Sequence, residues 1–439
     1  MSDAIQLPPH PDLDFYRALA RDLKDAVPGN GVRDWAARWV KRLSTLVVLE
    51  RFGKSGFPVE TVAAAIEKQW MRFAHRALHL DHLPASIQLS DAQFFVAHVH
   101  GFASWPRFAH HVETMSKADG LTVHFERAAD AIAAGDIETL RRLLREHPDL
   151  VHARSMREHH STLLHYVSAN GVEDFRQKTP PNIVAIAALL LDSGADVNAE
   201  SEAYSGHSTT LGLAATSVHP ENAGVQIALL ELLLARGANM EQRGQAGNGH
   251  SAVVGCLANG QGRAARFLAE RGAVLDLEGA AGVGDVAALA TFFDEDGRLT
   301  NGATPEHLRS GFLYAAGYGR DEAVRFLLER GVDPNTATAH GETGLHWTTY
   351  GPHLGTAQQL LDAGARLDVR DGHWHATPLD WALHHWADQY DASARERGYS
   401  LIEMFIRAGG VPDIDRYDER TRVVLQGDAR MMAIVGRRT

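Results

Sequence analysis

The chain has 439 residues, of which 45% are hydrophobic and 22% are charged, a composition typical of folded globular proteins. Lys and Arg together number 43 and Asp and Glu 55, so the formal net charge is −12. This charge argues against a general binder of nucleic acid or anionic membranes, because both ligands require clustered Lys and Arg. Residues 1–120 hold 14 basic and 13 acidic side chains, and the remainder holds 29 and 42. Any attraction for cationic partners therefore lies in the later part of the chain.

Cysteine content and apolar runs bear on the cellular compartment. Cys256 is the single cysteine, which excludes an internal disulfide framework and suits a reducing cytoplasm. The first fifteen residues lack the basic and apolar regions of a secretory signal. The longest apolar run, residues 183–191, is much shorter than the roughly 20 residues that span a bilayer. We therefore expect a cytoplasmic protein that neither spans nor binds a membrane.

The first part of the chain carries helical patterns without a repeat. These patterns cover residues 11–27, 33–52, 59–80 and 89–100, and a further one starts near residue 104. In the first pattern, Leu13, Tyr16, Leu19 and Leu23 fall on one face, as in an amphipathic helix. Gly101 breaks the fourth pattern, and Pro106 suits the first turn of the helix that follows. Residues 1–120 are therefore predicted to form a helical N-terminal domain.

One histidine stripe in this region suggests a possible alternative function. His75, His79 and His82 are spaced i, i+4 and i+7, which places them on one side of a helix where imidazoles can bind a metal. The opposite side is apolar, so the histidines equally suit the solvent-facing side of an amphipathic helix. We assign no metal and no cofactor on this pattern.

A recurring phrase closes successive blocks of the later sequence. It places a leucine-rich segment before a glycine, as in "LLLDSGADVN" and "FLLERGVDPN". The glycines are Gly194, Gly237, Gly272, Gly331, Gly364 and Gly409. The leucines mark the buried face of a helix, and the glycine suits the left-handed position just after its end.

A second phrase opens the blocks and carries a family resemblance. It starts with Ser or Thr, as in "STLLHYVSAN", "TGLHWTTYG" and "TPLDWALHH". Ser or Thr caps the first helix, Pro suits its first turn, and small residues let neighbouring helices approach closely. The blocks resemble the ankyrin repeat, which has about 33 residues, a T-P-L-H-x-A opening and two antiparallel helices. The resemblance implies an all-α solenoid of stacked helix-turn-helix units.

Spacing between the two phrases defines the units. In three blocks the closing Gly follows the opening Ser or Thr by 21 positions, and three other blocks carry insertions between their two helices. A degenerate unit occupies residues 275–299, which gives about eight units over residues 121–412. Residues 413–439 are predicted to form a final capping helix that shields the last apolar face.

The N-terminal domain has a resemblance of its own. The stretch "AHVHGFASWPRFAHH" is similar to an A-x-x-x-G-F-x-S-W-P-x-L-x-x-H segment that precedes ankyrin repeats in many bacterial proteins. This resemblance implies association with an ankyrin array and no activity. We expect the domain to cap the apolar side of the first repeat.

Several residues at repeat positions have structural roles implied by the resemblance. His165 and His346 occupy the fourth position of T-P-L-H, where the imidazole bonds to the backbone of adjoining loops. Thr377 and Pro378 open the last unit, and Asp380 takes the histidine position there. We expect Asp380 to accept a similar hydrogen bond.

Partner recognition in ankyrin arrays uses the finger loops, which join one unit to the next, and the start of each first helix. The register places aromatic and histidine side chains at these positions in the C-terminal half, and His159 at a finger tip near the start of the array. The candidates are Tyr318, His340, Tyr350, His373, Trp374, His384 and His385. Aromatic anchors supply much of the energy at binding sites. We expect a protein partner on a concave groove lined by these side chains, and neither nucleic acid nor membrane.

The alternative is a small-molecule-binding protein or an enzyme that uses the same patch. Sequence motifs for hydrolases, zinc proteases and EF-hands are lacking, so an enzyme would have to rely on a groove histidine as general base. Glu342 or Asp388 would orient it, and the insertion at residues 387–398 or the N-terminal domain would close the site. An open groove favours the protein binder, and a closed pocket with converging polar groups favours the enzyme.

Overall fold

Helices make up nearly all the regular structure in the computed structural model, which describes residues 4–8, 10–27, 31–46, 59–77, 86–117, 119–241, 251–389 and 391–436. The chain forms two units, residues 1–249 and residues 250–439. The division of the sequence into residues 1–120, 121–412 and 413–439 stays a prediction.

Among the described residues, five helices form the first part of unit 1, as the sequence patterns indicated. They are α1 (Leu13–Ala26), α2 (Val32–Leu46), α3 (Val59–Ala77), α4 (Leu89–Val99) and α5 (Trp105–Met115). Ser104 caps α5 with its side chain, and Pro106 lies in the first turn as predicted. His79 and His82 lie outside the described residues, so the predicted histidine stripe is not seen in full.

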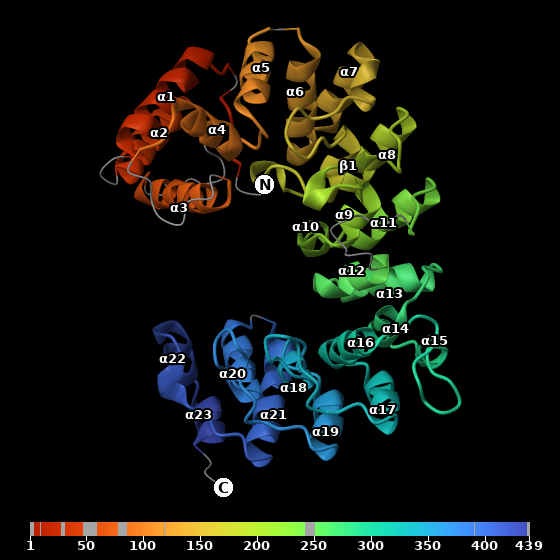
Figure 1. The fold of residues 1–439 in the computed structure, drawn as a ribbon. Coiled ribbons are helices and arrows are strands. Elements are labelled where there is room, and N and C mark those ends of the chain that lie inside the picture. The colour runs from red at the N-terminus through yellow and green to blue at the C-terminus, as the bar shows by residue number, and fades with distance from the viewer. Residues whose placement is uncertain are drawn as a thin grey trace. The chain divides into compact units, whose positions relative to one another are not determined.

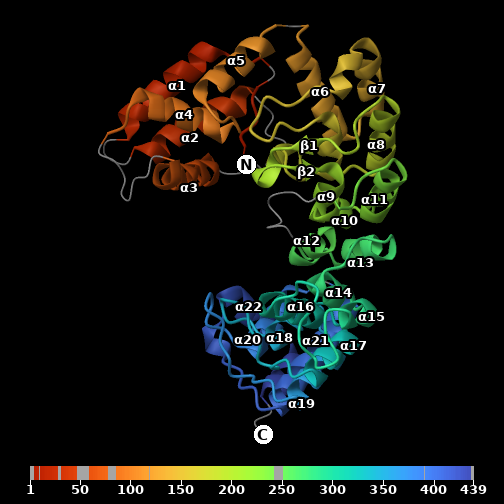
Figure 2. The same ribbon diagram turned by 45° about the vertical axis from the view of Figure 1, so that its right-hand side comes forward.

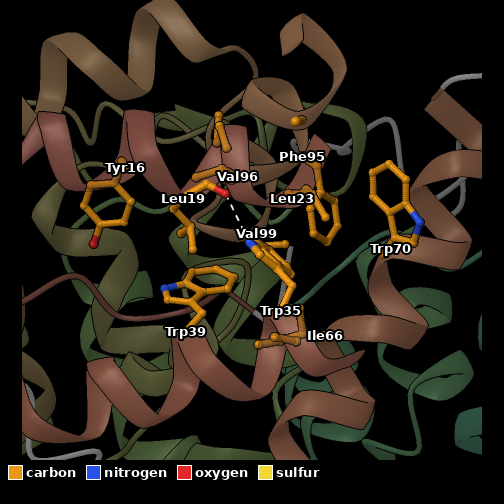
Figure 3. Close-up of a cluster of buried hydrophobic side chains, with 14 of the residues drawn as sticks. Tyr16, Leu19, Leu23, Trp35, Trp39, Ile66, Trp70, Phe95, Val96 and Val99 are labelled. Atoms are coloured by element: carbon orange, nitrogen blue, oxygen red, sulfur yellow. Dashed lines mark hydrogen bonds between the residues drawn. The ribbon is translucent and has the colours of Figure 1, made fainter. Parts of the chain in front are cut away.

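The core of this part is rich in tryptophan (Figure 3). Trp35, Trp39 and Trp70 are each at most 2% exposed. Trp35 and Trp70 contact Phe95, and Trp39 contacts Trp35. The indole N–H of Trp35 donates to the backbone carbonyl of Leu19 at 3.1 Å, which ties α2 to α1.

Helix pairs stack through the rest of unit 1. The elements are α6 (Leu121–Ala134), α7 (Ile137–Glu146), η2 (Pro148–Val151), η3 (Leu163–Ser168), η4 (Asp174–Arg176), α8 (Ile183–Asp192), β1 (Glu200–Ser201), η5 (Ala203–Ser205), β2 (Ser208–Thr209), α9 (Thr210–Ala215), α10 (Val218–Asn222) and α11 (Gln226–Ala235). Second helices α7, α8 and α11 follow one another in a row (Figures 1 and 2), and η3 packs between first helices α6 and α9. The two strands pair antiparallel and form a finger loop. Helix α5 packs on α6, so the N-terminal helices contact the first pair.

Unit 2 repeats the same arrangement. Its elements are α12 (Ala252–Ala258), α13 (Gly262–Glu270), α14 (Leu277–Val283), α15 (Val286–Ala290), α16 (Pro305–Gly317), α17 (Asp321–Glu329), α18 (Gly344–Trp347), α19 (Leu354–Asp362), α20 (Pro378–Asp388), α21 (Ala392–Arg407), η7 (Ile414–Arg416), α22 (Glu419–Gln426) and α23 (Ala429–Val435). First helices α16, α18, α20 and α22 form one row, and second helices α17, α19, α21 and α23 form another (Figure 1). The tail is therefore a helix pair that continues both rows, where the sequence suggested a single helix.

The predicted helix ends are confirmed at the closing glycines. All six have a positive φ, between 88° and 99° for five of them and 82° for Gly331. This left-handed conformation costs a residue with a Cβ atom free energy, and glycine adopts it freely.

Hydrogen bonds between neighbouring finger loops join successive repeats within each unit. His165 Nδ1 accepts from the Thr162 N–H, and its Nε2–H donates to the carbonyl of Ser208 in the next finger at 3.2 Å. His346 repeats this arrangement with Thr343 and the carbonyl of Ala376. Both imidazoles therefore make the hydrogen bonds to adjoining loops that the resemblance implies.

Asparagine side chains make a second set of hydrogen bonds between neighbouring repeats. Asn198 donates to the carbonyl of Gly237 at 3.0 Å and accepts from the Asn239 N–H at 2.8 Å. Asn335 likewise bonds to the carbonyl of Gly364 and to the Arg366 N–H. Both asparagines follow a closing glycine by four residues, so the same link recurs at the same place in the repeat.

A buried ion network holds the start of the array together. Arg157 bonds to Glu126 at 2.6 Å and to Glu173 at 2.9 Å, and Arg176 bonds to Glu126 at 2.8 Å. All four side chains are at most 7% exposed. Burial alone would raise the pKa of Glu126, but the two arginines outweigh it and lower that pKa to about 2. His159 lies 3.5 Å from Glu173 and is 3% exposed, so its predicted place at an exposed finger tip is wrong.

Within the parts of the chain that the structure describes, no helix combines the length and apolar character needed to cross a membrane.

Substituting one partner of the ion network tests its contribution to folding. Glu173→Ala removes one of the two buried carboxylates and leaves Arg157 and Arg176 to share Glu126, so we expect a loss of about 3–5 kcal/mol in the free energy of unfolding. Urea denaturation followed by circular dichroism measures it. Asp368→Ala is the matched control, because it removes an exposed ion pair with Arg366 and should leave the unfolding midpoint unchanged. Equal effects of the two variants would contradict the interpretation.

Buried histidines predict how stability depends on pH. Burial lowers the pKa of His165 to about 4 from 6.5, so between these values the unfolded chain binds more protons than the folded one. The stability that neutral His165 contributes is complete above pH 6.5 and is lost as the pH falls toward 4. Replacement by glutamine (His165→Gln) should lower stability at pH 7 and reduce the loss between pH 7 and pH 5 by about 1–2 kcal/mol. Thermal unfolding at both pH values measures this, and an undiminished pH dependence would contradict the prediction.

Candidate binding site

A pocket of about 410 Å³ opens in unit 2 beside first helices α18 and α20. Its lining residues are Tyr350, Trp374, Ala376, Asp380, Trp381, His384, His385, Arg416, Tyr417 and Asp418. Four of these, Tyr350, Trp374, His384 and His385, are among the seven residues predicted for the groove. Tyr350 and Asp418 lie 68 positions apart in the chain, and both line the pocket because neighbouring helix pairs stack side by side.

Three aromatic rings with different orientations form the walls. Trp381 is the shared member, with its ring centroid 5.7 Å from those of both Tyr350 and Trp374. The Trp381 plane lies at 81° to Tyr350 and at 69° to Trp374. Trp381 is 8% exposed, as expected of a core residue, whereas Tyr350 is 59% and Trp374 69% exposed. The pocket therefore has a fixed aromatic floor and two rings open to solvent.

Asp371 organises the finger loop that carries Trp374. This fully buried carboxylate accepts the backbone N–H groups of His373, Trp374 and Ala376 at 2.7–3.1 Å, and the indole N–H of Trp381 at 3.0 Å. Burial opposes the charged form, but these hydrogen bonds outweigh it and lower the pKa of Asp371. One side chain thus positions both tryptophans. Sequence reasoning missed Asp371, although its place four residues after Leu367 in a finger loop made it visible as a turn residue.

The C-terminal tail supplies the opposite wall. Tyr417 donates its hydroxyl proton to Asp380 Oδ1 at 2.7 Å, while Asp380 Oδ2 accepts from the backbone and hydroxyl of Thr377. The hydrogen bond predicted for Asp380 is therefore present, together with one from the tail. Burial, followed by the Asp380 carboxylate, raises the pKa of Tyr417. Residues 416–418 lie outside the repeats, so the repeat pattern did not reveal them. They line the pocket, whereas no described residue of the insertion at 387–398 is among its lining residues.

His385 is half-buried and has a defined protonation state. The Thr349 hydroxyl donates its single proton to the carbonyl of His346 at 2.7 Å, so its oxygen must accept from His385 Nδ1, 2.9 Å away. Burial lowers the pKa of His385 to about 4, helped by the neighbouring His384. The ring is therefore neutral at pH 7, with its proton on Nδ1.

The other predicted histidines are exposed. His384 lies 3.6 Å from Asp388, which in turn pairs with Arg420. The ring centroids of His340 and His373 lie 4.3 Å apart on adjacent finger loops, with their planes tilted by 40°, next to Trp374. Tyr318 lies apart from the pocket, where its hydroxyl donates to the carbonyl of Leu257 at 2.6 Å. Thr377 and Pro378 are buried at the start of α20, as expected of scaffold residues.

Cys256 and one group of potential metal ligands lie outside the pocket. Cys256 is buried, and burial raises the pKa of its thiol to about 12, so it is not a nucleophile at neutral pH. Among the described residues, Asp119, His124 and His147 form a group of potential metal ligands whose atoms lie within 4.8 Å of one another. The two imidazoles stack at 3.8 Å with an angle of 19° between their planes. Parallel stacked rings point their in-plane lone pairs past a shared ion, so this arrangement does not favour a metal.

Comparisons with known proteins address the repeats. Residues 312–393 match a family model described as "Ankyrin repeats (3 copies)". The chain is 33% identical over 110 residues to Palmitoyltransferase Hip14 of Drosophila melanogaster, a match that covers 25% of this chain and 16% of that protein. A solved structure of the ankyrin repeat domain of Bcl-3, a member of the IkappaB protein family, is 18% identical, with a TM-score of 0.28, and covers 58% of this chain and 92% of that chain. The family match includes Tyr350, Trp374 and Trp381, which form the aromatic walls of the pocket. Residues 312–393 therefore match ankyrin repeats, and the described chain is built mostly of stacked helix pairs.

Proposed function

We propose that the protein is a binding module that recognises a protein partner through the surface around the pocket. The observation that carries this proposal is the pair of exposed aromatic side chains, Tyr350 and Trp374, held beside the buried Trp381. Aromatic anchors at the centre of a site supply most of the binding energy in protein complexes. Ankyrin repeats generally mediate contacts between proteins. Both considerations favour a polypeptide partner.

The N-terminal helices and the C-terminal tail act as caps in this proposal, with residues 1–120 and 413–439 flanking an array over residues 121–412. Contacts of α5 with α6, and of α22 and α23 with α20 and α21, support this role because they cover the ends of helix rows. The single buried cysteine suits a cytoplasmic location.

The pocket itself supports a second candidate, a small-molecule ligand. Its volume of about 410 Å³ lies within the range of about 300–1,000 Å³ that is common for ligand sites. Such a ligand would occupy the same aromatic walls.

Catalysis receives less support than binding. The described lining residues include no Ser, Cys or Lys that would serve as a nucleophile. His385 is the candidate base, but a pKa of about 4 makes it a weak proton acceptor at pH 7. Asp388 lies beside His384 and not beside His385, so the pair needed to strengthen the base is lacking among the described residues.

Site-specific photo-crosslinking tests the protein-partner proposal. A photoreactive phenylalanine at the position of Trp374 should form a covalent adduct with a discrete polypeptide in a lysate of the native cell. The same group at Gln358, exposed on second helix α19, is the matched control and should form none. Purified partner should then bind Trp374→Ala at least tenfold more weakly, a loss of about 1.4 kcal/mol. An adduct of equal yield at both positions, or unchanged affinity, would contradict the proposal.

The histidines of the patch divide into two groups. Replacing His373 and His384 together by alanine should leave the melting temperature unchanged, because both are exposed. His385→Ala should lower stability by about 1–2 kcal/mol, since it removes the hydrogen bond to Thr349 and part of the packing against Tyr350. Differential scanning calorimetry distinguishes the two. A large loss in the double variant would show that these side chains are not free to contact a partner.

A further inference from the structure

We propose that the pocket binds a methylated ammonium group, namely the trimethylammonium head of a methylated lysine on the partner protein. This inference rests on the proposed function, because it identifies the side chain that the partner inserts. It follows from the ring geometry, the hydrogen-bond state of the lining carboxylates and the charge of the surface.

The aromatic walls suit a cation. Tyr350, Trp374 and Trp381 present rings at steep angles to one another around a single space, and two of them are tryptophans. A cation within about 6 Å of a ring centroid is attracted by the negative face of the ring, most strongly for Trp. Groups of three such rings are how proteins recognise quaternary ammonium ligands.

The lining carboxylates add negative charge and already accept hydrogen bonds, and Arg370 lies 3.6 Å from Asp380. Asp380 already accepts from Thr377 and Tyr417, and Asp418 accepts from the backbone and hydroxyl of Thr421. An unmodified lysine or an arginine brings three to five N–H donors that need partners when buried. A trimethylammonium group carries the positive charge without any donor. The pocket therefore favours the methylated cation over the unmodified one.

The charges that face the site are consistent with this choice. Asp380 and Asp418 line the pocket with Arg416, whose guanidinium donates to the carbonyl of His375 at 3.0 Å. His385 contributes no charge at pH 7. Over residues 250–439 the chain has 26 acidic residues against 19 arginines and no lysine, so the surrounding unit attracts a basic segment.

Preorganisation strengthens the argument. Asp371 holds both the backbone of Trp374 and the indole of Trp381, so the rings need little ordering when a ligand enters. The volume of about 410 Å³ exceeds that of one trimethylammonium head, which leaves room for the methylene chain of the lysine.

Calorimetric titration of the full chain tests the inference with three peptides. They share one short sequence of alanine and arginine and differ at a single side chain, which is lysine, trimethyllysine, or the neutral analogue with a tert-butyl group in place of the trimethylammonium. We expect the trimethyllysine peptide to bind at least tenfold more tightly than either of the others. Trp374→Ala and Tyr350→Ala should each reduce its affinity at least tenfold. Tyr204→Ala, which removes an exposed aromatic of unit 1, is the matched control and should not.

The alternative outcomes separate the possible errors. Equal affinity for the trimethyllysine and tert-butyl peptides would show that only apolar burial matters, and it would overturn the inference. Tighter binding of unmodified lysine would overturn it too. Choline is titrated in the same way as a free small molecule. If it binds as tightly as the trimethyllysine peptide, the site belongs to a small molecule and not to a protein side chain, and the inference is overturned. A partner that crosslinks at position 374 without any preference for trimethyllysine would refute this inference and leave the proposed function standing.

Discussion

The structure depends on contact between neighbouring repeats. A helix pair of this kind buries its apolar face only when another pair covers it, so no single repeat is stable alone. The histidine and asparagine links add directional bonds to that packing: His346 reaches the finger loop of the next unit, and Asn335 reaches the turn beyond it. Because the same bonds recur at the same repeat positions, they set the register between neighbouring repeats and also stabilise the stack.

The pocket is a consequence of that register. Tyr350 comes from one repeat, Trp374 and Trp381 from the next, and Tyr417 from the tail that follows. His346 connects scaffold and site directly, because its ring packs edge-on against Trp381 at 5.3 Å while its Nε2–H bonds to Ala376. A change that loosens the stacking of α18 on α20 would therefore change the pocket as well.

Buried polar groups follow two different rules in this chain. In unit 2, Asp371 accepts hydrogen bonds from four N–H donors, and these keep it charged. In unit 1, Glu126 and Glu173 are charged because two arginines accompany them. The first arrangement positions two tryptophans of a binding site. The second joins α6 to the loops around η3 and η4, where the repeats carry their first insertion.

The sequence by itself predicted the helical repeats, their glycine ends, the loop hydrogen bonds of His165 and His346, and four residues that line the pocket, Tyr350, Trp374, His384 and His385. These features are local or periodic, so spacing along the chain is sufficient to reveal them. Only the tertiary structure decided that Tyr318 lies apart from the pocket, that His159 is buried in an ion network, and that Tyr417 closes one wall. Those outcomes depend on contacts between residues far apart in the chain, and on burial and charge pairing, which no repeating pattern encodes.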